Sequence, residues 1–173
     1  MIKIFIQGIN DGKREVNLSI PVESIPDISA EFFGNVEING TFRKHHQRYT
    51  LQCDVSCNVK LICDLSLKEY TDTVSFEFNG AFIKDNQIFF EQKNRELRDN
   101  EEKAMHEDDK YIDITEDIRE ELFLHLPMKR CAPEYRNKNF EDLYPQFSNK
   151  KNKKKSEQKI YDHWSALKKI KLD

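Results

Sequence analysis

Strict alternation of apolar and polar residues along residues 51–67 is the feature that most constrains the fold. The even positions are almost all polar, and the odd positions are apolar or cysteine: Leu51, Cys53, Val55, Cys57, Val59, Leu61, Cys63, Leu65 and Leu67. Successive side chains of a strand point to opposite faces, so this period predicts a strand with one face on a core. Strands of this length seldom stay straight in a small domain, and a bend or bulge is expected near Ser56–Asn58.

Shorter alternating segments predict further strands at residues 16–20, 36–42 and 74–78. Between them lie turn-forming sequences at Asn10-Asp11-Gly12, Phe33-Gly34-Asn35 and Asn79-Gly80. The connections leave no room for crossover helices, so neighbouring strands are expected to pair antiparallel. The predicted fold class is α+β: a predominantly antiparallel β-sheet or partly open barrel with one packed helix and a basic C-terminal tail.

One helix is predicted within residues 112–127. Apolar residues at helical spacing form a single stripe, Ile114, Ile118, Leu122 and Leu126. Asp113 or Thr115 is expected to cap the helix, with Glu116 completing a capping box, and Pro127 ends it. The acidic side chains then face outward near the amino end of the helix dipole: Glu116, Asp117, Glu120 and Glu121.

The charge of the chain is unevenly distributed. Charged residues make up 34% and hydrophobic residues 38% of the chain, which indicates that part of it is not packed in a core. We expect one domain over residues 1–147, including an exposed acidic loop at 92–110, and a basic tail with a short terminal helix at 148–173. Residues 91–121 hold thirteen Asp or Glu against six Lys or Arg, whereas residues 148–173 hold nine Lys against three acids.

Hydropathy and the amino terminus indicate a soluble protein. No apolar segment approaches the roughly 20 residues of a membrane-spanning helix, and the amino terminus lacks the pattern of a signal peptide. We therefore expect a cytoplasmic protein without a membrane partner. In that reducing compartment the four cysteines are expected to be free thiols.

The cysteines are expected to be small core residues. Cys53 and Cys57 lie about 13 Å apart along a strand, too far for one zinc ion or for a disulfide. A metal held by Cys63, Cys131 and a third ligand stays open as an alternative. We expect no metal, no cofactor, no catalytic residue and no small-molecule substrate, since the sequence lacks nucleophile-elbow and phosphate-loop motifs and the thiols share an apolar face.

Two basic segments are candidates for contact with phosphates. The tail lysines can neutralise a nucleic-acid backbone, and Trp164 can stack on an unpaired base; the candidate RNA-binding residues are Lys150, Lys151, Lys153, Lys154, Lys155, Trp164, Lys168 and Lys169. A predicted turn gathers five further side chains that carry or can acquire positive charge, Arg43, Lys44, His45, His46 and Arg48. Both segments also fit solvated, solubilising surfaces.

A motif at residues 63–67 resembles a known family. Cys63-Asp64-Leu65-Ser66-Leu67, an acidic insert and a helix ending in Leu126-Pro127 resemble the YceD family, the large ribosomal RNA subunit accumulation proteins. The resemblance extends to Asn10-Asp11-Gly12, Phe32-Phe33 and the segment 164–169, and it implies a YceD-like domain over residues 1–147. The family-motif residues here are Cys63, Asp64, Ser66 and Leu67. Many relatives carry a cysteine where Ser66 stands and further cysteines near Cys131, which is alone here.

Two functions follow. The resemblance implies a non-catalytic ribosome-biogenesis factor that supports accumulation or processing of large-subunit (23S) ribosomal RNA by binding RNA or a pre-ribosomal particle. The alternative is a protein-interaction module that binds a ribosomal protein or an assembly enzyme without touching RNA. The acidic residues 91–121 favour the second hypothesis, because negative charge steers association with basic proteins.

Overall fold

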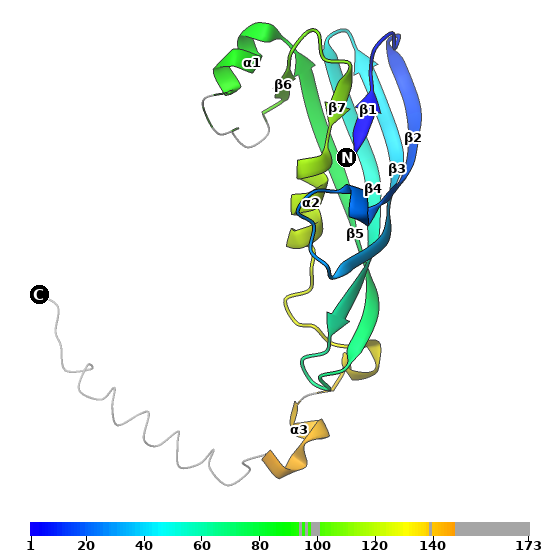
Figure 1. Cartoon of the computed structure of the whole chain (residues 1–173), viewed down its shortest axis with the longest axis vertical. Coiled ribbons are helices and arrows are strands. Elements are labelled where there is room, and N and C mark those ends of the chain that lie inside the picture. Colours follow the sequence, from blue (N-terminus) through cyan, green and yellow to red (C-terminus); the bar gives the residue numbers. More distant parts are fainter. Residues whose placement is uncertain (94, 96, 98–100, 139, 148–173) are drawn as a thin grey trace, which may run out of the picture. The chain divides into compact units, whose positions relative to one another are not determined.

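The computed structural model of the chain describes residues 1–93, 95, 97, 101–138 and 140–147. The chain divides into two compact units, Met1–Arg130 and Cys131–Asp173. The first is built on an antiparallel sheet (Figure 1), and the described part of the second contains η2 (Pro133–Tyr135), α3 (Phe140–Leu143) and η3 (Pro145–Phe147). The single domain expected over residues 1–147 stays a prediction.

The main sheet contains five strands in the order β2–β3–β4–β5–β6. Their bounds are β2 Gly12–Pro21, β3 Phe32–His45, β4 Arg48–Ile62, β5 Glu69–Lys84 and β6 Lys103–Met105. The first four strands pair antiparallel in sequence order, as predicted, whereas β6 is parallel to β5. A tight turn at His46-Gln47 joins β3 to β4, and His46 adopts a positive φ of 56° there. The sheet is open and does not close into a barrel.

The alternation in β4 is confirmed. Its odd-numbered side chains are buried from Tyr49 to Leu61, and most even-numbered ones are exposed. The strand ends at Ile62, so the prediction that alternation extends to Leu67 is wrong, and Leu67 is 78% exposed. The expected irregularity lies at the predicted level of the sheet but in the neighbouring strand: the register of β3 shifts between Phe33 and Val36, opposite residues 57–58 of β4.

Two predicted turns are instead parts of strands. Phe33-Gly34-Asn35 is the bulge of β3, where Gly34 takes a positive φ of 77°. Asn79-Gly80 lies within β5, because β5 pairs with β4 along its whole length. The missing side chain of Gly80 leaves room for the rings of Phe78 and Phe82, which a Cβ at this position would contact closely.

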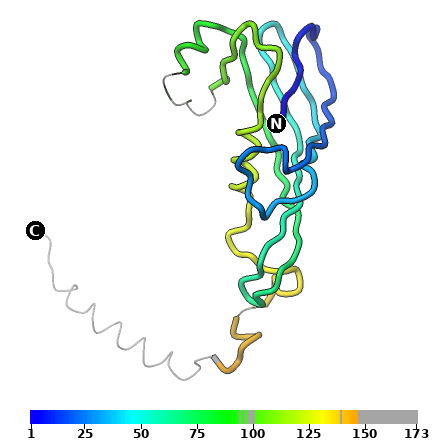
Figure 2. Tube along the Cα trace, viewed as in Figure 1, coloured from blue at the N-terminus to red at the C-terminus, as the bar shows by residue number. Residues whose placement is uncertain are grey.

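A second layer covers the inner face of the sheet. It contains the antiparallel pair β1 (Lys3–Phe5) and β7 (Tyr111–Asp113), the short η1 (Val22–Ser24) and α2 (Thr115–Leu124). Figure 2 shows the N-terminal segment running beside the segment that contains β7, far away in sequence. One core joins this layer to the inward side chains of β3, β4 and β5, and its fully buried members include Ile112, Ile118 and Leu122. Burial of these side chains is the main favourable contribution to folding.

The predicted helix is confirmed as α2, with a different amino-terminal arrangement. Ile114 occupies the N-cap position and provides no side-chain hydrogen bond, so the capping box is not formed. The Asp113 carboxylate instead accepts hydrogen bonds from the N–H (3.0 Å) and the hydroxyl (2.5 Å) of Thr115. The Thr115 hydroxyl oxygen in turn accepts a hydrogen bond from the buried N–H of Ile2 at 2.7 Å. Glu116 pairs with Arg119.

Residues 92–110, expected as an exposed loop, contain β6 and the buried side chain of Met105. The carbonyl of the Gln92 side chain accepts a hydrogen bond from the N–H of Ala104 at 2.7 Å and fixes β6 beside the preceding helix, α1 (Asn86–Gln92). Periodicity gives no signal for a three-residue strand whose pairing depends on a distant edge.

No helix in the described residues is long and apolar enough to cross a membrane.

Candidate nucleic-acid interface

The outer face of the sheet is a polar surface that the second layer leaves uncovered. The register places outward side chains of four strands in rows across the sheet. Behind the row His45, Arg48 and Ile83 at the β3–β4 turn, one row is Lys13, Arg43, Thr50 and Ala81, and the next is Glu15, Thr41, Gln52 and Asn79. The strand order therefore collects residues that are far apart in the sequence.

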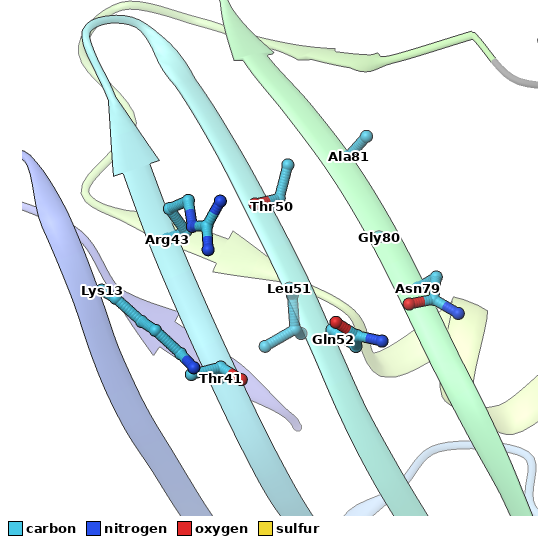
Figure 3. A pocket seen from close by; sticks show the side chains of 9 residues that line it. All are labelled: Lys13, Thr41, Arg43, Thr50, Leu51, Gln52, Asn79, Gly80 and Ala81. Carbon is cyan, nitrogen blue, oxygen red and sulfur yellow. The ribbon is translucent and has the colours of Figure 1, made fainter.

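A shallow hollow of about 330 Å³ opens on this face. It is lined by Lys13, Thr41, Arg43, Thr50, Leu51, Gln52, Asn79, Gly80 and Ala81. Figure 3 shows that the two cations come from β2 and β3, whereas the two amides come from β4 and β5. Small residues at Thr50, Gly80 and Ala81 leave space between the longer side chains.

The chemistry of the hollow suits a phosphate backbone. Within the described part of the chain, no ion pair engages Lys13 or Arg43, so both charges are available to a ligand. The threonine hydroxyls beside them are donors and acceptors for phosphate and sugar oxygens. The side-chain nitrogens of Gln52 and Asn79 donate to the Glu77 carboxylate at 2.8 and 3.4 Å, so these amides offer a ligand their oxygens as acceptors. The hollow has no aromatic lining on which a base would stack.

Charges in the predicted basic turn are largely used within the protein. Lys44 donates a hydrogen bond to the Ile9 carbonyl at 2.6 Å, and its Nζ lies 3.7 Å from the Asp11 carboxylate. The backbone N–H of His46 also donates to Asp11, and this bond, aided by Lys44, lowers the pKa of Asp11. Arg48 pairs with Glu102 at 3.3 Å. Arg43 is therefore the member of this group that faces the hollow.

The family-motif residues form the connection between β4 and β5. The N–H of Cys63 donates to the Lys68 carbonyl at 2.9 Å, and the N–H of Leu67 donates to the Cys63 carbonyl at 2.8 Å. Leu67 takes a positive φ of 56° to close this loop. The hydroxyl of Ser66 is buried without a hydrogen-bond partner among the described residues.

Asp64 ties this loop to the segment that follows α2. Its N–H donates to the Arg130 carbonyl at 2.7 Å, and its carboxylate accepts from the Arg130 N–H at 2.7 Å. The guanidinium of Arg130 binds the Glu31 carboxylate with both terminal nitrogens, at 2.6 and 3.3 Å. The motif thus contributes backbone anchoring rather than a cluster of reactive groups.

The cysteine side chains are buried free thiols. Burial raises the pKa of Cys53 and of Cys57 to about 11, so neither is a nucleophile at neutral pH. Across the described residues, no group of three or more His, Cys, Asp or Glu side chains is arranged to hold a metal ion. The expected absence of a metal stays a prediction.

Comparison with known proteins identifies the family. The family model described as "Large ribosomal RNA subunit accumulation protein YceD" matches residues 51–171, more than half of the chain. The chain belongs to the YceD family. Its family name implies a role in large ribosomal RNA subunit accumulation. No curated protein and no solved structure matches the chain.

The YceD match begins in β4, so the hollow combines matched and unmatched segments. Gln52 and Asn79 lie within the match, whereas Lys13, Thr41 and Arg43 precede it. The predicted RNA-binding residues of the tail, from Lys150 to Lys169 and including Trp164, lie outside the described residues.

Sequence reasoning singled out Arg43 but missed the other members of the hollow. Alternation assigns Gln52 to the outward face, yet only the strand register places Lys13 and Thr41 beside it. The turn predicted at Asn79-Gly80 conceals the position of Asn79, which lies in β5 on the sheet face.

Proposed function

We propose that this YceD-family protein is a non-catalytic, cytoplasmic ribosome-biogenesis factor that supports accumulation or processing of large-subunit (23S) ribosomal RNA by binding RNA or a pre-ribosomal particle. Membership of the YceD family supports large-subunit ribosomal RNA as the class of ligand. The observation that supports direct contact with RNA is the hollow on the outer face. There, Lys13 and Arg43 make no ion pair within the described structure and lie among hydroxyl and amide side chains.

The hollow is proposed to position the backbone of RNA without reading its sequence. The two cations and the threonine hydroxyls match phosphate and ribose oxygens, the amide oxygens of Gln52 and Asn79 can accept from ribose hydroxyls, and the open sheet gives a nucleic-acid strand access from solvent. Glu77, held by Gln52 and Asn79, marks the acidic edge of the hollow, and Glu37 and Asp54 lie further along the same face; these carboxylates repel phosphates there. The RNA path is therefore confined to the end of the sheet near the β3–β4 turn, with the tail lysines adding contacts that do not depend on sequence.

The test is a salt titration of binding to a fragment of large-subunit ribosomal RNA. Replacing Lys13 and Arg43 together by glutamine removes two phosphate contacts, so the slope of log affinity against log salt should fall by about 0.7 per contact for a single strand. The double substitution Lys68→Gln and Lys129→Gln removes the same charge at two exposed lysines that make no ion pair within the described residues, and it is the matched control. Equal losses in both double variants would refute the hollow as the binding site.

A second comparison tests the tail and the absence of catalysis. Deleting residues 148–173 should lower both the affinity and the salt slope, because nine lysines are lost against three acids. The RNA recovered after incubation with the intact protein should keep its length. Shortened RNA, with the activity following the protein through purification, would contradict a non-catalytic role.

A further inference from the structure

The solvent face of α2 carries an apolar hollow with a predominantly acidic rim. Phe123 is 39% exposed and Leu124 is 76% exposed, although both belong to a helix packed on the core. Together with Asp27, Arg119 and Glu120 they line a shallow hollow of about 600 Å³. Exposed apolar side chains that lie together at the end of a helix mark an interaction site more strongly than scattered ones.

Helical spacing aligns the charges with this hollow. Residues four apart lie on the same side of a helix, so Glu116, Glu120 and Leu124 form one outward row. Arg119 pairs with Asp27 at 3.7 Å and also with Glu116, and it is the cation of the rim. No ion pair within the described residues engages Glu120. The rim keeps a net negative charge.

The hollow is preformed. The ring of Phe123 packs edge-on against Phe32, with centroids 5.7 Å apart and planes at 87°. Phe32 is buried, and the neighbouring helix residue Leu122 is fully buried. This anchoring fixes the end of α2, so a partner would not have to order the surface on binding.

We propose that this surface of α2 docks a lysine- or arginine-rich protein segment that carries one large apolar side chain. The apolar group fills the hollow between Phe123 and Leu124, while cations of the partner meet Glu120 and the carboxylates beside it. RNA does not fit, because its phosphates would face this acidic rim. The proposal goes beyond the RNA contact of the sheet and does not rest on it, since the two surfaces use different residues.

A fluorescent synthetic peptide of lysine and alanine with a single leucine is the probe. Its binding to the full chain is measured by anisotropy, beside a version with serine for leucine and a version with glutamate for lysine. The lysine–leucine peptide should bind, and each altered peptide should bind at least about tenfold more weakly. Equal binding of the serine version would show general charge attraction and would overturn the proposal.

Variants of the protein locate the site. Leu124→Ser and Glu120→Lys are substitutions of exposed residues, and each should weaken peptide binding by about tenfold. The matched controls are Leu67→Ser, at a side chain 78% exposed in the β4–β5 loop, and Asp108→Lys, at a carboxylate 94% exposed in the acidic segment 91–121. Controls that weaken binding as much as the test variants would refute the location.

The two proposals fail separately. The double variant of Lys13 and Arg43 should keep full affinity for the peptide, and Glu120→Lys should not weaken RNA binding. If Glu120→Lys raises RNA affinity more than Asp108→Lys does and leaves peptide binding unchanged, α2 lies against RNA and the proposed basic partner is wrong.

Discussion

Replacing Thr115 by valine should destabilise the protein although the two side chains have nearly the same shape. The hydroxyl of Thr115 accepts the hydrogen bond of the Ile2 N–H at 2.7 Å and donates to the Asp113 carboxylate at 2.5 Å. Ile2 is fully buried and Thr115 is 9% exposed, so water does not replace the lost acceptor. Leaving the buried Ile2 N–H without an acceptor costs about 1–3 kcal/mol, and losing the hydrogen bond to the half-exposed Asp113 carboxylate costs about 1 kcal/mol more. We expect a loss of about 3 kcal/mol.

Urea unfolding followed by circular dichroism measures this loss. Thr115→Ser keeps the hydroxyl and should cost less than about 1.5 kcal/mol, while Thr71→Val, at an exposed strand position, should change stability by less than about 0.5 kcal/mol. A loss below about 1 kcal/mol for Thr115→Val would refute the reasoning, because it would mean that the Ile2 N–H finds another acceptor.

The same substitution should change the dependence of stability on pH. Burial raises the pKa of Asp113, but the hydrogen bonds from Thr115 and the nearby Lys3 outweigh it, and the net pKa is lowered from 3.8. The stabilisation is therefore present above the unfolded pKa of about 3.8 and is lost as the pH falls through the lower folded pKa. Thr115→Val removes one of these donors, so its stability should fall less steeply with acid than that of the parent.

Three further changes test other parts of the molecule. Ser66→Ala removes a buried hydroxyl that lacks a partner in the described structure and should raise the free energy of unfolding by about 1 kcal/mol; a loss would show that a bound water satisfies it. Cys53 and Cys57 should resist iodoacetamide at pH 8 and react after denaturation, and rapid labelling of the native protein would contradict their raised pKa. Gly40→Ala should destabilise by more than about 2 kcal/mol, since its Cβ would overlap backbone atoms of β4, and near-native stability in urea would show that the strands separate easily.

Much of the sheet could be predicted because the alternation of apolar and polar residues is a property of each strand by itself. The alternation in β4 and the stripe on α2 each follow from the geometry of one element, and the structure confirms both. Turn chemistry was less reliable. Asn79-Gly80 has the composition of a hairpin turn, yet the complementary length of β4 holds these residues in β5. The tertiary pairing overrides the local preference.

The candidate sites could be predicted only in part, because each depends on register. The position of Lys13 beside Arg43 follows from the pairing of β2 with β3, which no single segment determines. The acidic face of α2 could be predicted from the sequence. The exposure of Phe123 and Leu124 could not, because periodicity identifies the buried stripe of the helix and does not show whether apolar residues outside that stripe are covered by other elements.

The pairing of β1 with β7 has a consequence for synthesis on the ribosome. Strands β2 to β5 follow one another along the chain, so each can join its neighbour soon after it leaves the exit tunnel. Ile2, Ile4 and Ile6, all buried in the finished protein, have to wait for about a hundred further residues to be translated before β7 can emerge. These apolar side chains therefore stay without their partner strand until β7 has been translated, and closure of the core is a late event.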